Sequence, residues 1–161
     1  MMDLISRLFA HRAPALSEAG PSDAMAISQL HSASFRRGWS EDEVETLLLD
    51  PSVVADRAVS GRKLVGFVLS RLAADEAEIL SIAVEPAARG RGLGRKLLHR
   101  NLQRLAGLGV RSVFLEVDAA NSPALRLYEA MGFDEVGRRE GYYRDDIGAA
   151  STALVLRRDL G

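Results

Sequence analysis

The sequence predicts a single α/β domain built around one mixed, mostly antiparallel sheet flanked by helices. Helical and strand-like patterns follow one another along the chain, which favours one mixed sheet over separate all-α and all-β units. Three consecutive apolar stretches are joined by short turns, as in an antiparallel meander. The chain has 161 residues, 47% of them hydrophobic and 27% charged, which suits one globular domain with a real core.

The first 20 residues are expected to form an N-terminal extension, and residues 21–161 the domain. Apolar residues recur at helical spacing near the start, which predicts a short helix; they are Leu4, Ile5, Leu8 and Phe9. Residues 17–23 are rich in turn formers and predict a linker, with Ser22 or Asp23 placed to cap the next helix.

The first half of the domain predicts two helices and then three strands. Residues 23–35 show helical spacing, and Ser40 with Glu43 forms a capping-box pattern ahead of a helix over 40–50. The three strands are expected at residues 52–60, 63–74 and 76–86.

The second half predicts helix, strand, helix, strand. A stripe of leucines, Leu98, Leu102 and Leu105, predicts a helix that ends near Gly107 and Gly109. Residues 112–118 read as a strand, 122–132 as a helix with Pro123 in its first turn, and 152–160 as the last strand.

Composition excludes several classes of function. The formal net charge is -1, so no overall field favours nucleic acid or an anionic membrane. There is no cysteine, hence no disulfide framework, thiolate metal site or cysteine nucleophile, and the three histidines are scattered. No apolar run is long enough for a membrane span, and the start does not fit a secretory signal. We expect a cytoplasmic protein with no metal.

The stretch "VEPAARGRGLGRKLL" (84–98) joins a predicted strand to a predicted helix through three glycines. A glycine turn entering a helix N-terminus lets phosphate oxygens approach unpaired main-chain N–H groups. From Pro86 to Leu115 there are seven Arg or Lys residues and no acid. The P-loop pattern fails because no hydroxyl residue follows Lys96, and the dinucleotide pattern fails because its third glycine is absent.

A third pattern fits. Arg89-x-x-Gly92-x-Gly94, between a strand and a leucine-rich helix, resembles the pyrophosphate-binding signature of the GNAT superfamily of acetyl-CoA dependent N-acetyltransferases. The resemblance runs from about Asp23 to the C-terminus and includes "LEVDAANSPALRLYEAMGF" (115–133). With "FRRGWSEDE" (35–43), "SIAVEP" (81–86) and "GYY" (141–143), the chain is similar to the RimI-type subfamily, which acetylates the N-terminal alanine of a small-subunit ribosomal protein.

The resemblance implies a splayed strand at the acetyl-CoA site and a set of site residues. Glu116 would accept the proton of the amine, and Tyr128 would protonate the departing thiolate. The residues implied in cofactor binding are Ile82, Ala83, Val84, Arg89, Gly90, Arg91, Gly92, Leu93, Gly94, Arg95 and Asn121. The first three would act through main-chain groups. Residues 151–153 depart from the acidic-Ala pair usual in the subfamily, which leaves substrate contacts there open.

The residues themselves support part of this assignment. Phe114, Glu116 and Asp118 share one face of a strand, so Glu116 lies beside a large apolar side chain, where a carboxylate is costly unless it is used or paired. A surface carboxylate is the alternative for Glu116, and Glu78 is a reserve base. A core tyrosine is the alternative for Tyr128.

Three aromatic residues are candidates for a peptide groove by resemblance: Trp39, Tyr142 and Tyr143. Ordinary packing is at least as plausible an explanation for Trp39.

Other functions stay open at this point. An acyl-CoA sensor would keep the glycine loop without needing both Glu116 and Tyr128, and an RNA-binding module would use the basic stretch but lacks interleaved aromatic residues. Among enzymes, direct transfer to a protein N-terminus competes with transfer to an internal lysine or a small amine. The lower pKa of an α-amine, about 7.7–8.0 against about 10.4 for lysine, favours the N-terminus.

Overall fold

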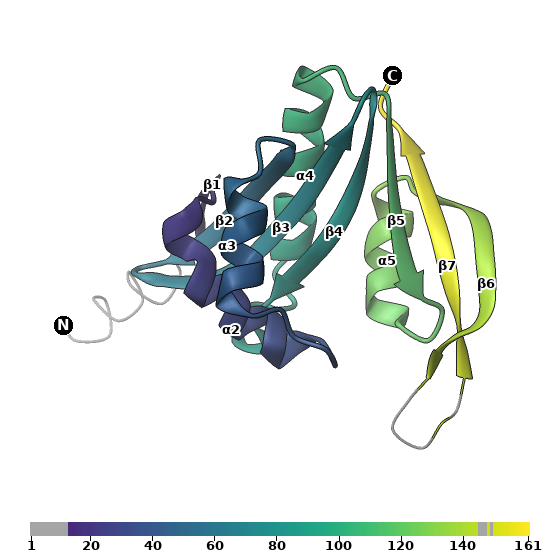
Figure 1. The fold of residues 1–161 in the computed structure, drawn as a ribbon, viewed down its shortest axis with the longest axis horizontal. Coiled ribbons are helices and arrows are strands. Elements are labelled where there is room, and N and C mark those ends of the chain that lie inside the picture. Colours follow the sequence, from purple (N-terminus) through teal and green to yellow (C-terminus); the bar gives the residue numbers. More distant parts are fainter. Residues whose placement is uncertain (1–12, 145–147, 149) are drawn as a thin grey trace.

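The computed structural model describes residues 13–144, 148 and 150–161, which form a seven-stranded sheet with helices on both faces (Figure 1). The strand order is β1-β2-β3-β4-β5-β7-β6. The strands are β1 (Ala15–Glu18), β2 (Val53–Ser60), β3 (Lys63–Ala73), β4 (Glu76–Val84), β5 (Ser112–Asp118), β6 (Asp134–Arg144) and β7 (Ala150–Asp159). The helices are α2 (Ala24–Ser34), α3 (Glu41–Leu49), α4 (Leu93–Gly107) and α5 (Ser122–Ala130), with 3-10 turns η1 (Pro21–Asp23) and η2 (Pro86–Ala88).

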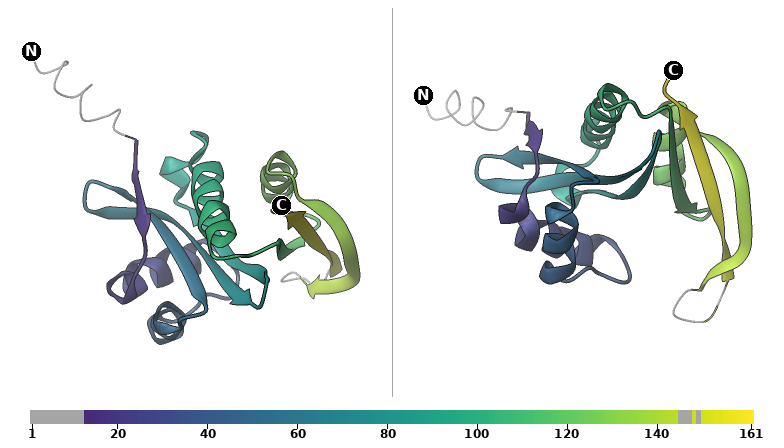
Figure 2. Two further views of the ribbon diagram at one scale, coloured as in Figure 1. Left: turned by 90° about the horizontal axis from the view of Figure 1, so that it is seen from above. Right: turned by 45° about the horizontal axis from the view of Figure 1, so that its top comes forward.

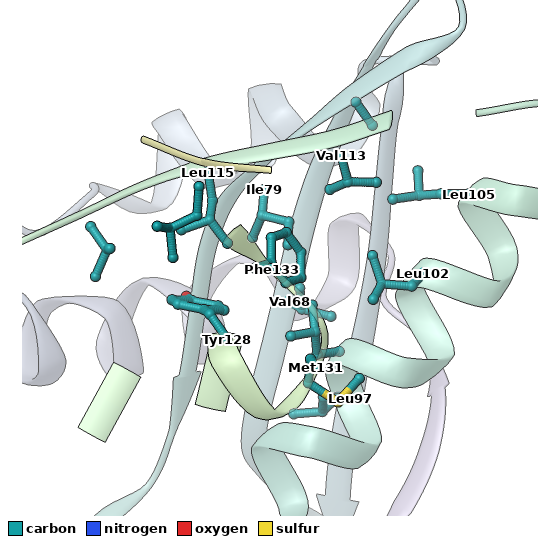
Figure 3. Packing of buried hydrophobic residues seen from close by; sticks show 14 of the residues in the cluster. Val68, Ile79, Leu97, Leu102, Leu105, Val113, Leu115, Tyr128, Met131 and Phe133 are labelled. Atoms are coloured by element: carbon teal, nitrogen blue, oxygen red, sulfur yellow. The ribbon is translucent and has the colours of Figure 1, made fainter. Parts of the chain in front are cut away.

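The helices form two layers, one on each face of the sheet. Figure 2 shows α2 and α3 on one face and α4 and α5 on the other. Each layer has its own hydrophobic cluster. The larger one, drawn in part in Figure 3, joins the leucines of α4 to Val113 and Leu115 of β5 and to Tyr128 of α5. The smaller one joins α2 and α3 to Phe67 and Leu69 of β3.

The predicted α/β class and most predicted elements are confirmed. Strands β2, β3 and β4 pair antiparallel in sequence order, as the short turns between them predict. Helix α3 begins with the expected capping box, in which the Glu43 N–H donates to Ser40 Oγ at 3.1 Å. Helix α5 begins at Ser122 with Pro123 in its first turn, and the Asn121 side chain caps it.

Two strands were not predicted, and both lie at edges of the sheet. β1 pairs with β2 within the stretch that we expected to be extension and linker. Among the strands that the structure describes, β6 pairs with β7 alone; it is mostly polar, and its Val136 is exposed. An edge strand that buries little apolar surface carries no alternating pattern, so periodicity cannot reveal it. The helix predicted from Leu4 to Phe9 lies outside the described residues.

Strands β4 and β5 separate after a short parallel ladder. They pair only at Glu76–Ser112, Ala77–Val113 and Glu78–Phe114, and Figure 1 shows them diverging beyond that point. On the β3 side of β4, Leu69 faces Ser81 whereas Ser70 faces Ile79, so Leu80 is an extra residue, a β-bulge. The predicted splayed strand is therefore present, and the bulge lies where the two strands part.

A buried polar network anchors α4 to the sheet. The carboxylate of Asp56 on β2 is fully buried and accepts hydrogen bonds from Arg100 Nε and Asn101 Nδ2, both at 2.9 Å, and from Arg104. The Ser70 hydroxyl donates to Asn101 Oδ1. Because a buried carboxylate needs charged or dipolar partners, this network holds the helix in one position over β2 and β3.

No helix within the described ranges is long and apolar enough to cross a membrane.

Candidate functional site

The gap between β4 and β5 opens into a cleft of about 1110 Å³. Its walls come from the diverging halves of both strands, from the turn before α4, and from the first turns of α5. The end of α2, and Tyr143 of β6 with Ala150 and Ser151 of β7, complete the lining. Beyond Glu78, β4 pairs with no described strand on its β5 side, so its main-chain N–H and C=O groups on that side are available to a bound molecule, apart from the Val84 carbonyl, which accepts from Arg89.

The basic glycine turn forms the anion-binding end of this cleft. Gly90 and Gly92 adopt φ of 80° and 74°, left-handed values that favour glycine, and Gly92 caps α4. Apart from the chain neighbours, a Cβ at either position would meet no atom of a described residue within 4 Å, so main-chain approach is unobstructed. The Arg89 Nε–H donates to the Val84 carbonyl at 2.9 Å, which ties this turn to the end of β4.

The cleft brings together all but one of the proposed catalytic and cofactor-binding residues. Both proposed catalytic residues, Glu116 and Tyr128, line it. The cofactor-binding candidates that line it are Ile82, Ala83, Val84, Arg89, Gly90, Gly92, Leu93, Gly94, Arg95 and Asn121. Arg91 is exposed and is not among the lining residues, so its contact with the cofactor stays a prediction.

Glu116 is exposed to the cleft and held by a tyrosine. Its neighbours Leu115 and Val117 belong to the cluster under α4 and α5, so Glu116 itself faces the α2/α3 side of the sheet. The Tyr143 hydroxyl donates to Glu116 Oε1 at 3.0 Å. Burial and this carboxylate raise the pKa of Tyr143 above its usual range, so the phenol keeps its proton and remains a donor.

Tyr128 lies on the opposite side of the cleft. Its side chain is buried in the α4/α5 cluster, where the ring packs edge-on against Phe133 at 5.7 Å between centroids (Figure 3). Burial raises the pKa of Tyr128 to about 12, because the phenolate is poorly solvated there. A phenol with this pKa is protonated at neutral pH and suits the role of an acid rather than a base.

The reserve base Glu78 lies elsewhere. It faces Phe114 in the β4–β5 ladder and lines a separate cavity of about 270 Å³, which adjoins the cleft at Leu115 and Glu116. A further cavity of about 490 Å³ adjoins the cleft at Leu80 and is lined by Trp39, Asp42, Glu43, Thr46, Leu47 and Arg71. Each of the two smaller cavities therefore shares lining residues with the cleft.

The turn between α2 and α3 contributes residues that sequence reasoning did not assign to the site. Phe35, Arg36 and Arg37 line the cleft. Behind them the buried His31 ring stacks on Trp39 at 4.1 Å, and His31 Nδ1 accepts the Trp39 N–H at 3.1 Å. Burial lowers the pKa of His31, which keeps the ring neutral and able to accept this bond. Trp39 therefore packs against the turn and also borders the 490 Å³ cavity.

Residues 151–153, which depart from the RimI-type sequence pattern, include a side chain that ties β7 to β5. The Ser151 hydroxyl donates to Asp118 Oδ2 at 3.0 Å, which joins the β7 end of the hairpin to the end of β5 at the cleft mouth. Tyr142 stacks edge-on with Tyr143 at 5.2 Å and lies under the Arg139 guanidinium. Within the described part of the chain, no group of three or more His, Cys, Asp or Glu residues is arranged to hold a metal ion.

The arrangement fits acyl transfer to an amine. Donors for an anion lie at one end of the cleft, a carboxylate faces the α2/α3 side, and a protonated phenol lies on the α4/α5 side. A base and an acid on opposite sides of one gap can serve an incoming amine and a departing thiolate in the same step.

Comparison with known proteins agrees with this reading. The family model for the acetyltransferase (GNAT) family matches residues 24–133. The alanine N-acetyltransferase of ribosomal protein bS18 from Escherichia coli strain K12 is 41% identical over 93 residues, which are 58% of this chain and 63% of that protein. This chain thus spans less than two thirds of that relative's length.

Solved structures share the fold over nearly the whole chain. The crystal structure of the ribosomal-protein-S18-alanine N-acetyltransferase from Escherichia coli aligns with a TM-score of 0.85 and 28% identity, over 92% of this chain and 94% of that one. Arabidopsis thaliana NAA60 in complex with acetyl-CoA aligns with a TM-score of 0.80 and 24% identity, over 91% and 98% of the two chains, which shows the fold alone.

Proposed function

The chain belongs to the acetyltransferase (GNAT) family, and from this we propose that it transfers the acetyl group of acetyl-CoA to the N-terminal amine of a protein, in the cytoplasm. We further propose that the substrate begins with alanine and is a small-subunit ribosomal protein, as the names of its relatives indicate for them. The observation that carries the proposal is that the β4–β5 cleft gathers the anion-binding turn, Glu116 and Tyr128.

The chain's own groups are suited to hold acetyl-CoA. The pyrophosphate would bind the main-chain N–H groups at the start of α4, with Arg89 and Arg95 adding charge. The pantetheine arm would pair with the unpaired edge of β4 at Ile82, Ala83 and Val84, and with the Asn121 side chain. When bound, the cofactor supplies an acetyl thioester, a carbonyl carbon with a good leaving group.

The residues then divide the proton transfers between them. Glu116 receives the proton that the amine loses as its nitrogen bonds to the carbonyl carbon. Tyr128 donates a proton to the sulfur as the carbon–sulfur bond breaks, and solvent restores both residues afterwards. The products are an N-acetyl chain and free CoA. Glu116 is favoured over Glu78 as the base because only Glu116 lines the main cleft.

An N-terminus is favoured over a lysine side chain on two grounds. The α-amine has the lower pKa, so far more of it is neutral at pH 7 and one carboxylate suffices. Two smaller cavities also lie beside the cleft and share Leu80, Leu115 and Glu116 with its lining, which would give room for a chain of several residues rather than a lone small amine.

A peptide panel tests the substrate. Free peptides that begin with Ala, Leu or Phe, a blocked peptide with an internal lysine, and a polyamine are incubated with acetyl-CoA and analysed by mass spectrometry. We expect acetylation of the Ala peptide and slow acetylation of the Leu and Phe peptides, because a small pocket for the first side chain would favour Ala. The preference should amount to a few kcal/mol at most. Modification confined to lysine or polyamine would reject the N-terminal substrate but keep the acetyltransferase.

A pair of variants tests the base. Glu116→Gln keeps the shape and should lower kcat by about 10²–10⁴ at neutral pH, with partial recovery at higher pH where more amine is already neutral. Glu78→Gln is the matched control, and its kcat should stay within about threefold of the unmodified chain. A large fall in kcat for Glu78→Gln, with the kcat of Glu116→Gln nearly unchanged, would make Glu78 the base.

A further inference from the structure

Ser81 on β4 carries a hydroxyl that the proposed chemistry has not used. The residue is 7% exposed, and its Oγ is buried without a hydrogen-bond partner among the described residues. No other buried side-chain nitrogen or oxygen in the described ranges lacks a partner. The buried Ser70 on the adjacent strand is the contrast, since its hydroxyl donates to Asn101.

A buried hydroxyl without a partner destabilises a fold, so its presence calls for an explanation in ligand binding or catalysis. Ser81 lines the main cleft, where a bound molecule can supply the missing bond.

The bulge determines which side of the sheet Ser81 faces. Ile79 and Ile82 belong to the α4/α5 cluster, whereas Leu80 and Ala83 belong to the α2/α3 cluster. Because Leu80 is the extra residue, Leu80 and Ser81 both lie between Ile79 and Ile82 on the α2/α3 side. Without the bulge, strand alternation would turn Ser81 toward α4.

Glu116 faces the same side from the opposite strand. It alternates with Leu115 and Val117 of the α4/α5 cluster, so Ser81 and Glu116 border the cleft from β4 and β5 on one face. Tyr128 belongs to the other face. The proposed acid for the thiolate and the proposed base for the amine therefore border the gap from opposite faces of the sheet, and Ser81 lies on the same face as the base.

We propose that Ser81 Oγ accepts a hydrogen bond from the attacking amine and positions it for reaction. This inference rests on the proposed acetyl transfer. A neutral primary amine has one lone pair and two N–H bonds. The lone pair attacks the carbonyl carbon, one N–H proton passes to Glu116, and the second N–H stays bonded to nitrogen and points to Ser81.

The test compares Ser81→Ala with Ser70→Ala, two buried serines on neighbouring strands. For Ser81→Ala we expect kcat/KM with an Ala peptide to fall about 10–100-fold, the loss of one hydrogen bond to a group that becomes charged. The Kd for acetyl-CoA should stay within about twofold by calorimetry, and Tm should be unchanged or higher. Ser81→Thr should restore most of the kcat/KM. Ser70→Ala should show the opposite result, a lower Tm with kcat/KM retained.

Two further measurements isolate the contact. In the presence of CoA, which cannot react, the Kd for the Ala peptide should rise in Ser81→Ala. An N-methyl-alanine peptide has only one N–H, so the unmodified enzyme should prefer alanine over N-methyl-alanine by a larger factor than Ser81→Ala does. A preference equal in both enzymes would overturn the proposal, as would an unchanged kcat/KM or a loss of Tm like that of Ser70→Ala.

The outcomes separate this proposal from the proposed function. If the unmodified chain acetylates only lysine or polyamine, the N-terminal substrate fails, and the same Ser81 comparisons made with that amine decide the contact. If no amine is acetylated, both proposals fail.

Discussion

Replacing Tyr128 by Phe removes one oxygen from the cleft and leaves the ring in place. The side chain is 6% exposed and packs against Phe133, so the variant should keep its fold and its Tm to within a few degrees. If the phenol protonates the departing thiolate, kcat should fall about 10²–10⁴-fold. The Kd for acetyl-CoA should change only a few-fold, because a proton donated in the transition state contributes little to ground-state binding.

The pKa of Tyr128 gives this prediction a second, sharper form. With a pKa of about 12, only about 0.3% of the phenol is ionised at pH 9.5, against about 24% for an ordinary tyrosine of pKa about 10. The kcat of the unmodified enzyme should therefore rise with pH as the amine loses its proton, and should show no decline from Tyr128 up to pH 9.5.

Steady-state kinetics between pH 6.5 and 9.5, with calorimetry for acetyl-CoA, checks both statements. A kcat within threefold of the unmodified enzyme would return Tyr128 to a packing role. A decline in kcat above pH 9 that disappears in Tyr128→Phe would keep the residue as the acid but refute the effect of burial. The fold gives an independent check. The folded pKa lies above the unfolded one, so the stability that this proton contributes is present below pH 10 and lost as the pH rises toward 12.

Two further predictions concern the cofactor site and the fold. Gly92→Ala should weaken acetyl-CoA binding at least about tenfold by calorimetry. Gly109→Ala is the control, because Gly109 also has positive φ and open space but lies at the far end of α4; it should lose similar stability and keep the Kd for acetyl-CoA unchanged. If both variants bind acetyl-CoA with the same Kd, the phosphates bind elsewhere. Asp56→Ala should lower the free energy of unfolding by about 3 kcal/mol. This is near the lower limit for breaking a buried ion pair, because the guanidinium groups of Arg100 and Arg104 both reach solvent. The corresponding fall in Tm by calorimetry is about 6–12 °C. A Tm within 2 °C of the unmodified chain would contradict the role assigned to this network.

The sequence was informative where local chemistry decides the structure. The glycine turn before α4, the Ser40 cap and the alternation around Glu116 each follow from residues within a few positions of one another, and each is present. The contact of Tyr143 with Glu116 spans 27 positions and could not be read from spacing.

What the sequence could not show depends on long-range partners. Asp56 lies in a predicted strand, and nothing in its neighbours reveals that Arg100 and Arg104 will reach it from α4. The side of the sheet on which Ser81 borders the cleft depends on the bulge at Leu80, which becomes visible only when β4 is paired with β3.

The short ladder between β4 and β5 has a mechanical consequence. Within the sheet, three residue pairs at one end connect the part formed by β1–β4 to the part formed by β5–β7. Among the described strands, the two parts are not paired with each other beyond this joint. A small rotation about residues 76–78 and 112–114 changes the width of the cleft least near this joint and most at the far ends of the strands. The turn before α4 follows the far end of β4, and Asn121 at the start of α5 follows the far end of β5, so a molecule that contacts both would set the angle between the two parts.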